Sequence, residues 1–171
     1  MLKIYYSKSN NLSKSSSDYI KKIISSFLYI DKKKIIIEKT EFGKPYLKDY
    51  PNIHFNLSHT KGMIVFALSD KEVGIDIERI KKFNERIPIK FFSTNEQSYI
   101  FQKNEGQEIR FHEIWTRKEA YVKWLGMGMK KSFNSFDVLE NKKITTLYLE
   151  DYIVSICSDV RYDICKCLTI V

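Results

Sequence analysis

The pattern of apolar and polar positions along the chain predicts three helices. Over residues 18–28, apolar side chains recur every three or four positions, as on one buried helix face. Ser93 and Glu96 form the capping-box pattern at the start of a second, short helix. A third helix covers about residues 108–125 and ends at Gly126, a residue type favoured just after a helix.

Short apolar runs bounded by polar turns predict antiparallel strands, and the polar, serine-rich segment 10–17 predicts a flexible surface loop. The predicted strands are 35–38, 55–57, 63–68, 73–78, 136–139, 144–149, 153–157 and 164–170. This mixture predicts an α+β fold, with helices packed on antiparallel sheet. A division near residue 72 gives two halves, each with helix and strands.

Length and composition indicate a folded chain. With 171 residues, 43% of them apolar, and 11 Tyr, 11 Phe and 2 Trp, the chain can bury a core as one domain or two small lobes. No apolar run approaches the ~20 residues of a membrane-spanning helix. The first ten residues lack the apolar stretch of a secretory signal, so we expect a cytoplasmic protein without a membrane partner.

The net charge of +8 favours an anionic partner: nucleic acid, phosphate groups, anionic lipid or an acidic protein. It does not choose among them, because the abundance of Lys, Ile, Asn and Tyr also reflects genome composition. Cys157, Cys165 and Cys167 form no C-x-x-C pair, so we expect reduced thiols and neither a disulfide framework nor a zinc site.

The strand 73–78 carries two carboxylates on one face. Side chains alternate along a strand, so Asp76 and Glu78 share a face with Gly74, while Ile75 and Ile77 point the other way. Neighbouring carboxylates repel one another, and a hard cation such as Mg²⁺ relieves that repulsion. The alternative is an exposed strand face with two ordinary acids.

Glu119 and Lys123 lie four residues apart on one face of the third predicted helix. Such a pair is usually a surface pair worth about 0.2–0.5 kcal/mol. Together with the strand carboxylates, however, Glu119 would complete an oxygen-ligand metal site, and Lys123 would add a cation for a phosphate. Trp115, one turn earlier, is expected to pack in the core.

Two further segments carry polar groups near turns. Ser58 and His59 follow an apolar strand and offer a hydroxyl and an imidazole to an anion; the alternative for His59 is a bond to backbone. A serine nucleophile is disfavoured, because no Gly-x-Ser-x-Gly elbow is present. Lys44 and Pro45 form a stiff turn. Its lysine could hold a phosphate, or the segment could be a turn with no binding role.

Taken in their order along the chain, the four segments resemble the 4′-phosphopantetheinyl transferase superfamily, and more specifically its Sfp-type branch. The resemblance covers roughly residues 35–139 and rests on Gly43-Lys44-Pro45, Asn56-Leu57-Ser58-His59, Gly74-Ile75-Asp76-Ile77-Glu78 and Trp115-x-x-Lys118-Glu119-Ala120-x-x-Lys123. It implies two similar α+β lobes related by a pseudo-two-fold, each with antiparallel strands packed on helices, and an active site between them. Residues 1–72 would form the coenzyme A nucleotide side, and 73–171 the metal and carrier-docking side.

The resemblance implies a Mg²⁺-dependent enzyme that transfers the 4′-phosphopantetheine arm of coenzyme A to a serine of an acyl or peptidyl carrier protein. Adenosine 3′,5′-bisphosphate would be released. The implied metal ligands are Asp76, Glu78 and Glu119, and the implied catalytic residues are Glu119, Lys123 and His59. The implied coenzyme A contacts are Lys44, Pro45, Ser58, His59 and Lys123.

The implied partner is an acidic apo carrier protein, docked near the loop 126–133 and attracted by the basic surface, with the enzyme a monomer that binds no nucleic acid. The segment before Gly43 is short for the branch. Its candidates for the 3′-phosphate of coenzyme A are Lys8, Lys14, Lys21 and Lys22. The alternative functions are a basic nucleic-acid-binding module and a Mg²⁺-dependent phosphohydrolase built on the three acids.

Overall fold

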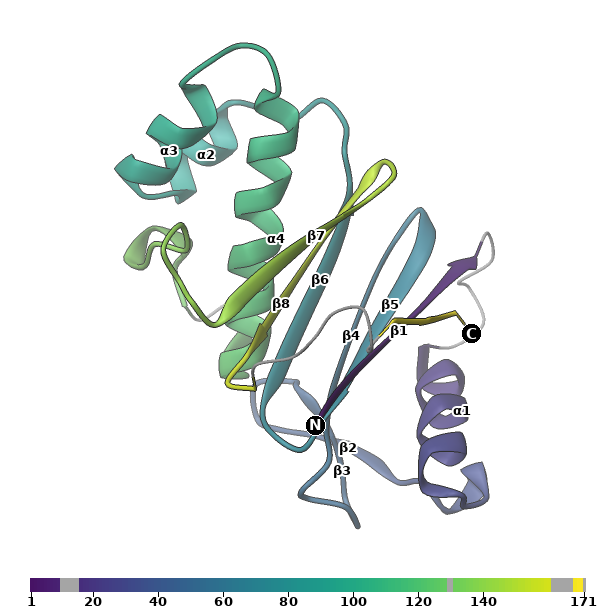
Figure 1. The fold of residues 1–171 in the computed structure, drawn as a ribbon. Helices are drawn as coiled ribbons and strands as arrows, with labels where there is room; N and C mark the ends of the chain where they lie inside the picture. The colour runs from purple at the N-terminus through teal and green to yellow at the C-terminus, as the bar shows by residue number, and fades with distance from the viewer. Residues whose placement is uncertain (10–15, 129–130, 161–167, 171) are drawn as a thin grey trace.

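Two small β-sheets pack against each other at the centre of the molecule, and helices cover their outer faces (Figure 1). The computed structural model describes residues 1–9, 16–128, 131–160 and 168–170. The first sheet has the order β4-β5-β1-β9 and the second the order β6-β8-β7. Their strands are β1 (Leu2–Ser9), β4 (His54–Thr60), β5 (Gly62–Ser69), β9 (Leu168–Ile170), β6 (Val73–Arg79), β7 (Ile144–Leu149) and β8 (Tyr152–Ser158).

The helices lie on opposite outer sides of the two sheets (Figure 1). One covers the first sheet, one packs on the second with the remaining two beside it, and a separate two-stranded ribbon joins the first helix to β4 (Figure 1). The helices are α1 (Ser16–Leu28), α2 (Arg86–Phe91), α3 (Thr94–Phe101) and α4 (Gln107–Leu125), with short 3₁₀ turns at Lys32–Lys34 and Phe133–Ser135. The ribbon consists of β2 (Ile37–Lys39) and β3 (Pro45–Leu47).

The two lobes repeat one topology. In each, a first strand leads to a helix and then to an antiparallel hairpin whose second strand returns beside the first: β1, α1 and β4–β5 in one lobe, β6, α4 and β7–β8 in the other. Both helices pack on the outer face of their own sheet. The predicted α+β fold of two similar lobes is confirmed, and the repeated topology agrees with the expected pseudo-two-fold.

Strand alternation divides the apolar side chains among three cores. On β6, Val73, Ile75 and Ile77 enter the core between the sheets, where they meet residues of β1, β5 and β8. On β5, Phe66 and Leu68 point the other way, into the core under α1. Since one face of β6 is thus committed to the inter-sheet core, the face with its carboxylates is turned toward α4.

The sequence pattern located most elements but missed four features. It gave no strand for β1, a turn in place of β3 and no helix for α2, and it predicted a strand at 136–139. That strand is wrong: the residues form an irregular segment whose backbone groups bond to side chains of α3 and α4. The capping box of α3 and the end of α4 at Gly126 are confirmed.

The C-terminal strand β9 does not follow the predicted division of the chain into two lobes at residue 72. The boundary itself falls in the turn between β5 and β6, but β9 pairs in parallel with β1 and so belongs to the sheet of the first lobe. Residues 10–15 and 164–167 of the predicted loop and strand lie outside the described residues, as do Cys165 and Cys167. Cys157 is a buried free thiol.

No helix in the described part of the chain is both long enough and apolar enough to cross a membrane.

Gly74 allows β6 to lie directly against α4. A methyl group at this position would collide with the Ala120 carbonyl oxygen and the Trp124 amide nitrogen, and would lie 3.0 Å from the Lys123 carbonyl carbon. These are backbone atoms inside a helix and cannot move aside, so glycine is required for the close approach.

We expect Gly74→Ala to lower the free energy of unfolding by about 3 kcal/mol or more, at the upper end of overpacking effects. The measurement is urea unfolding followed by circular dichroism. Gly43→Ala is the matched control: an added methyl group there meets nothing within 4 Å, although its φ of +84° makes the change cost about 1 kcal/mol. Equal losses in the two variants would contradict the close-approach explanation.

Candidate functional site

A cavity of about 980 Å³ lies between the two lobes. The first lobe contributes the start of α1, the β2–β3 ribbon and β4, and the second contributes α4 and the segment that follows it. The residues that line this cavity include Lys39, Lys44, Pro45, Trp115, Glu119, Lys123, Lys131 and Phe133. The predicted position of the site, between the lobes, therefore coincides with this cavity.

Asp76, buried behind the wall of this cavity, forms an ion pair with Lys123, whose side chain lines the wall and is 27% exposed. Lys123 Nζ lies 2.6 Å from Asp76 Oδ1 and also donates to the Ile75 carbonyl oxygen at 3.2 Å. Ser58 Oγ donates to the same Asp76 oxygen at 2.7 Å. The pair joins β6 to α4, and Ser58 adds β4 of the first lobe.

A second polar contact fixes β4 against β6. The side-chain oxygen of buried Asn56 accepts a hydrogen bond of 3.0 Å from the backbone amide of Ile75. An amide at the edge of a sheet would otherwise be buried without a partner. The Asn56-x-Ser58 spacing places both side chains on the same face of β4, so two bonds from one strand hold the lobes in register.

The pKa values of all three predicted acids are raised. Burial raises the pKa of Asp76, and the nearby Lys123 opposes that shift. Burial, and then the charge of Asp76, raise the pKa of both Glu78 and Glu119. The charge of Asp76 thus acts on both glutamates, which agrees with the alternation that places Asp76 and Glu78 on one face of β6.

The fit of a metal ion to these acids is partial. Among the described residues, no group of three or more His, Cys, Asp or Glu side chains is arranged to hold a metal ion. Instead, the ammonium of Lys123 supplies the positive charge beside Asp76 Oδ1. Asp76 Oδ2, however, is buried with no hydrogen-bond partner in the described structure. An all-oxygen set with one unsatisfied carboxylate oxygen is the chemistry that suits Mg²⁺.

Lys44 spans the two lobes. Its ammonium lies 2.5 Å from Glu72 Oε2 and donates to the Trp124 carbonyl oxygen, at the end of α4, at 3.1 Å. Its methylene carbons pass close to Gly126. Lys44 and Pro45 both line the cavity, so the predicted turn lies at the site, but the lysine also links the ribbon to α4.

The structure does not bring every predicted residue to the cavity. His59 is exposed at the end of β4 and is absent from the cavity wall, and Ser58 lies behind that wall. Lys8 pairs with Glu150 at the surface, and Lys22 lines a separate small hollow beside α1. Lys14 lies outside the described residues.

Sequence reasoning missed the basic side chains of the wall. Lys39 on β2 and Lys131 after α4 both line the cavity and add positive charge at its two sides. Nothing in the local sequence marks these two lysines, because their position depends on how the ribbon and the segment after α4 fold back. Trp115, which was expected to pack in the core, also lines the cavity and packs edge-on to Phe133 with ring centroids 5.6 Å apart.

The fold and the site together define a class: a two-lobed α+β protein whose inter-lobe cavity is lined by Glu119 and several lysines, with buried Asp76 behind it. The family model of the "4′-phosphopantetheinyl transferase superfamily" matches residues 72–163, more than half of the chain. A model of the "4′-phosphopantetheinyl transferase, N-terminal" region matches residues 3–71. The chain belongs to the 4′-phosphopantetheinyl transferase superfamily.

Curated relatives confirm the predicted Sfp-type branch. The chain is 38% identical to 4′-phosphopantetheinyl transferase gsp of Aneurinibacillus migulanus over 77% of its length, and 38% identical to psf-1 of Bacillus pumilus over 78%. It is 33% identical to Sfp of Bacillus subtilis over 70%. These matches cover 55%, 58% and 54% of the relatives, so the chain spans little more than half their length.

We expect Glu119→Gln to raise the thermal unfolding midpoint in EDTA at pH 7. The pKa of the Glu119 carboxyl is raised in the folded state, so the folded protein holds this proton more tightly than the unfolded chain does. Its contribution to stability is complete below the pKa of an unfolded glutamate and is lost as the pH rises through the raised pKa of the folded state. The glutamine has no charge to desolvate. The gain should disappear near pH 4, about where an unfolded glutamate titrates. A variant less stable than the wild type at pH 7 would contradict this account.

Proposed function

We propose that this chain transfers the 4′-phosphopantetheine arm of coenzyme A to a serine hydroxyl of an acyl or peptidyl carrier protein. The observation that carries the proposal is the meeting of Glu119, Lys123 and Lys44 at one inter-lobe cavity, with Asp76 directly behind them. Family membership supports the same reaction.

The nucleotide end of coenzyme A is proposed to lie along the first-lobe wall. Lys44 and Pro45 form part of that wall, and Lys39 adds a second ammonium on β2. A lysine provides a point charge for a phosphate without demanding fixed geometry. Lys123 at the opposite wall is then the cation for the pyrophosphate, while Ser58 and exposed His59 offer further donors at the end of β4.

Asp76, Glu78 and Glu119 are proposed to hold Mg²⁺. When bound, this ion would act as a Lewis acid that neutralises and aligns the pyrophosphate oxygens. The unsatisfied Asp76 Oδ2 and the shared repulsion of the three acids support the choice of ligands.

Glu119 is proposed as the base that accepts the proton of the attacking serine. Burial and the charge of Asp76 raise the pKa of its carboxyl, which makes the carboxylate a stronger proton acceptor. Its side chain lines the cavity, where a hydroxyl from outside can reach it. Lys123, on the next turn of α4, keeps positive charge beside the phosphate that loses its bond.

The carrier protein is proposed to dock at the rim beside α2 and the end of α4. Ile89, Phe91 and Met127 are exposed there, and Phe91 also lines the cavity. A net charge of +8 would accelerate encounter with an acidic partner. Since both walls of the cavity come from one chain, we infer that the protein works as a monomer. We also place it in the cytoplasm, without a nucleic-acid or membrane partner.

Incubation with coenzyme A, Mg²⁺ and a panel of apo carrier proteins should add one phosphopantetheine group to at least one carrier, measured by intact mass. Asp76→Ala and Glu119→Ala should each reduce the rate by about 100-fold or more, because charge neutralisation dominates this chemistry. Asp151→Ala, an exposed acid on the turn between β7 and β8, is the matched control and should leave the rate unchanged. Release of bisphosphate without any carrier would indicate a phosphohydrolase instead.

Mg²⁺ should raise the unfolding midpoint of the wild type in a concentration-dependent way, because a ligand that binds only the folded state stabilises it. Asp76→Asn should abolish this shift. Thermal unfolding over a Mg²⁺ titration, with Na⁺ at equal ionic strength as control, measures it. An equal shift in the two proteins would exclude Asp76 as a ligand.

A further inference from the structure

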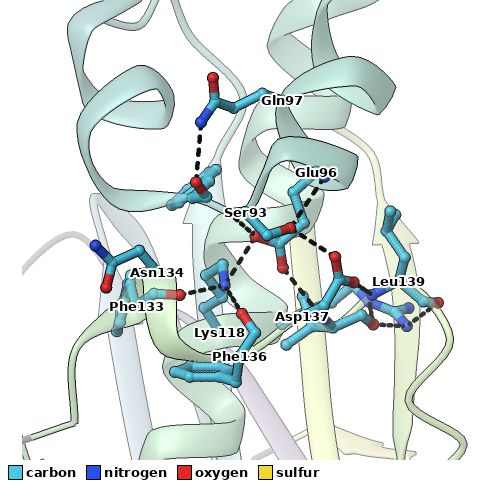
Figure 2. Close-up of polar contacts among 12 residues, drawn as sticks. Ser93, Glu96, Gln97, Lys118, Phe133, Asn134, Phe136, Asp137 and Leu139 are labelled. Atoms are coloured by element: carbon cyan, nitrogen blue, oxygen red, sulfur yellow. Dashed lines mark hydrogen bonds and ion pairs between the residues drawn. The ribbon is translucent and has the colours of Figure 1, made fainter.

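Lys118, the first lysine of the α4 motif, has no role in the proposed chemistry. Its side chain is fully buried, as is that of Glu96 on α3, and Lys118 Nζ lies 2.8 Å from Glu96 Oε2 (Figure 2). Burial lowers the pKa of Lys118, and the ion pair with Glu96 opposes this shift. A buried pair of this kind seldom adds net stability over an apolar pair of similar volume, so its presence calls for another explanation.

The ammonium of Lys118 also holds the backbone of segment 133–139. It donates to the carbonyl oxygens of Phe133 at 2.6 Å and Phe136 at 2.7 Å, which turn toward it in Figure 2. The ring of Phe136 lies 4.2 Å from the ammonium, with those of Phe92 and Phe133 somewhat farther away. Water is therefore kept from these bonds, which strengthens them.

Glu96 holds the same segment from the other side. Its Oε1 accepts from the Val138 amide at 2.9 Å, and its Oε2 accepts from the Ser93 amide at 2.8 Å. Asp137 in turn accepts from the Ser93 hydroxyl at 2.6 Å (Figure 2). Arg117 donates to the carbonyl oxygens of Val138 and Leu139. Side chains of α3 and α4 thus replace the ladder bonds that a strand would have made.

The segment held in this way begins in the cavity wall. Phe133 lines the cavity and contacts Trp115, which lies one turn before Glu119 on α4. Lys131 and Ser132, immediately before it, line the same wall. A shift of the Phe133 carbonyl would therefore move the wall next to the proposed base.

We propose that Lys118 and Glu96 are positioning residues, whose ion pair fixes the Lys131–Phe133 wall of the cavity beside Glu119. The kinetic part of this proposal rests on the proposed transferase function. The structural part does not, because it concerns only where Phe133 and Trp115 lie.

The test compares Lys118→Met, the double variant Glu96→Gln/Lys118→Met, and a matched control, Thr116→Val. Thr116 is equally buried on α4 but bonds to Ser155 of β8 and does not touch the segment. The double variant removes both charges and should restore much of the unfolding midpoint lost in Lys118→Met, because no uncompensated charge remains. It cannot restore the donor to the Phe133 and Phe136 carbonyls.

The first measurement needs no substrate. In a Trp124→Phe background, Trp115 is the one remaining tryptophan. We expect a red-shifted Trp115 emission and stronger acrylamide quenching in both Lys118→Met and the double variant, but not in Thr116→Val. If Lys118→Met does not fold, the double variant alone carries the test.

The second measurement is steady-state kinetics at a temperature where every variant is folded. We expect KM for the carrier protein to rise about tenfold in Lys118→Met and in the double variant, since the wall is displaced. Coenzyme A affinity, measured by calorimetry, should stay within about twofold, because the Lys44 wall is untouched.

A double variant that regains both the wild-type Trp115 signal and the wild-type KM would overturn the proposal and leave the pair a stability element. If the wild type transfers no group to any carrier but the Trp115 signals change as expected, the proposed function fails and the positioning role stands.

Discussion

The arrangement of this molecule depends on one buried carboxylate at the junction of three elements. Asp76 projects from β6 toward α4, whose close approach Gly74 permits, and it pairs there with Lys123 while accepting a bond from Ser58 of β4. Removal of Lys123 would leave the Asp76 charge almost without water, at a cost of several kcal/mol. The same contact therefore sets the strand against the helix and one lobe against the other.

Two lysine–carboxylate ion pairs fix α4 on two sides, one fully buried and one with a partly exposed lysine. Lys123 faces the inter-lobe junction, and Lys118, five residues earlier, faces α3 and the segment after the helix. Such pairs are poor sources of stability but are sensitive to geometry, because a small displacement exposes the charge to a low-dielectric interior. A helix anchored by charges on two sides can hold Glu119 between them with little freedom to rotate.

The sequence could predict what depends on local periodicity. The capping box at Ser93, the end of α4 at Gly126 and the alternation that turns Asp76 and Glu78 toward α4 all follow from neighbouring residues. The pairing of Asp76 with Glu78, and of Glu119 with Lys123, could be predicted because strand and helix periods fix which side chains share a face. The motif order then pointed to the family, which the comparisons confirm.

What could not be predicted depends on long-range packing. Residues 136–139 have the apolar, β-prone composition of a strand, but their backbone bonds go to Lys118, Arg117 and Glu96, which lie far away in the sequence. His59 and Lys8 carry the right chemistry, yet their strands end at the surface, away from the cavity. Local pattern identifies a residue type and a face, but not which distant wall that face meets.

The cavity requires both lobes, because each lobe contributes a different part of its wall. The acid in its wall, Glu119, comes from the second lobe, whereas the β2–β3 ribbon with Lys39 and Lys44 comes from the first. Neither wall alone brings Glu119 together with the lysine turn of the ribbon. The polar bonds of Asn56 and Ser58 to β6, together with Lys44 across the end of α4, therefore do more than stabilise an interface: they set the distance between the two halves of the site. In the proposed reaction, a small error in that distance would be costly, since alignment of the reacting groups supplies much of the rate.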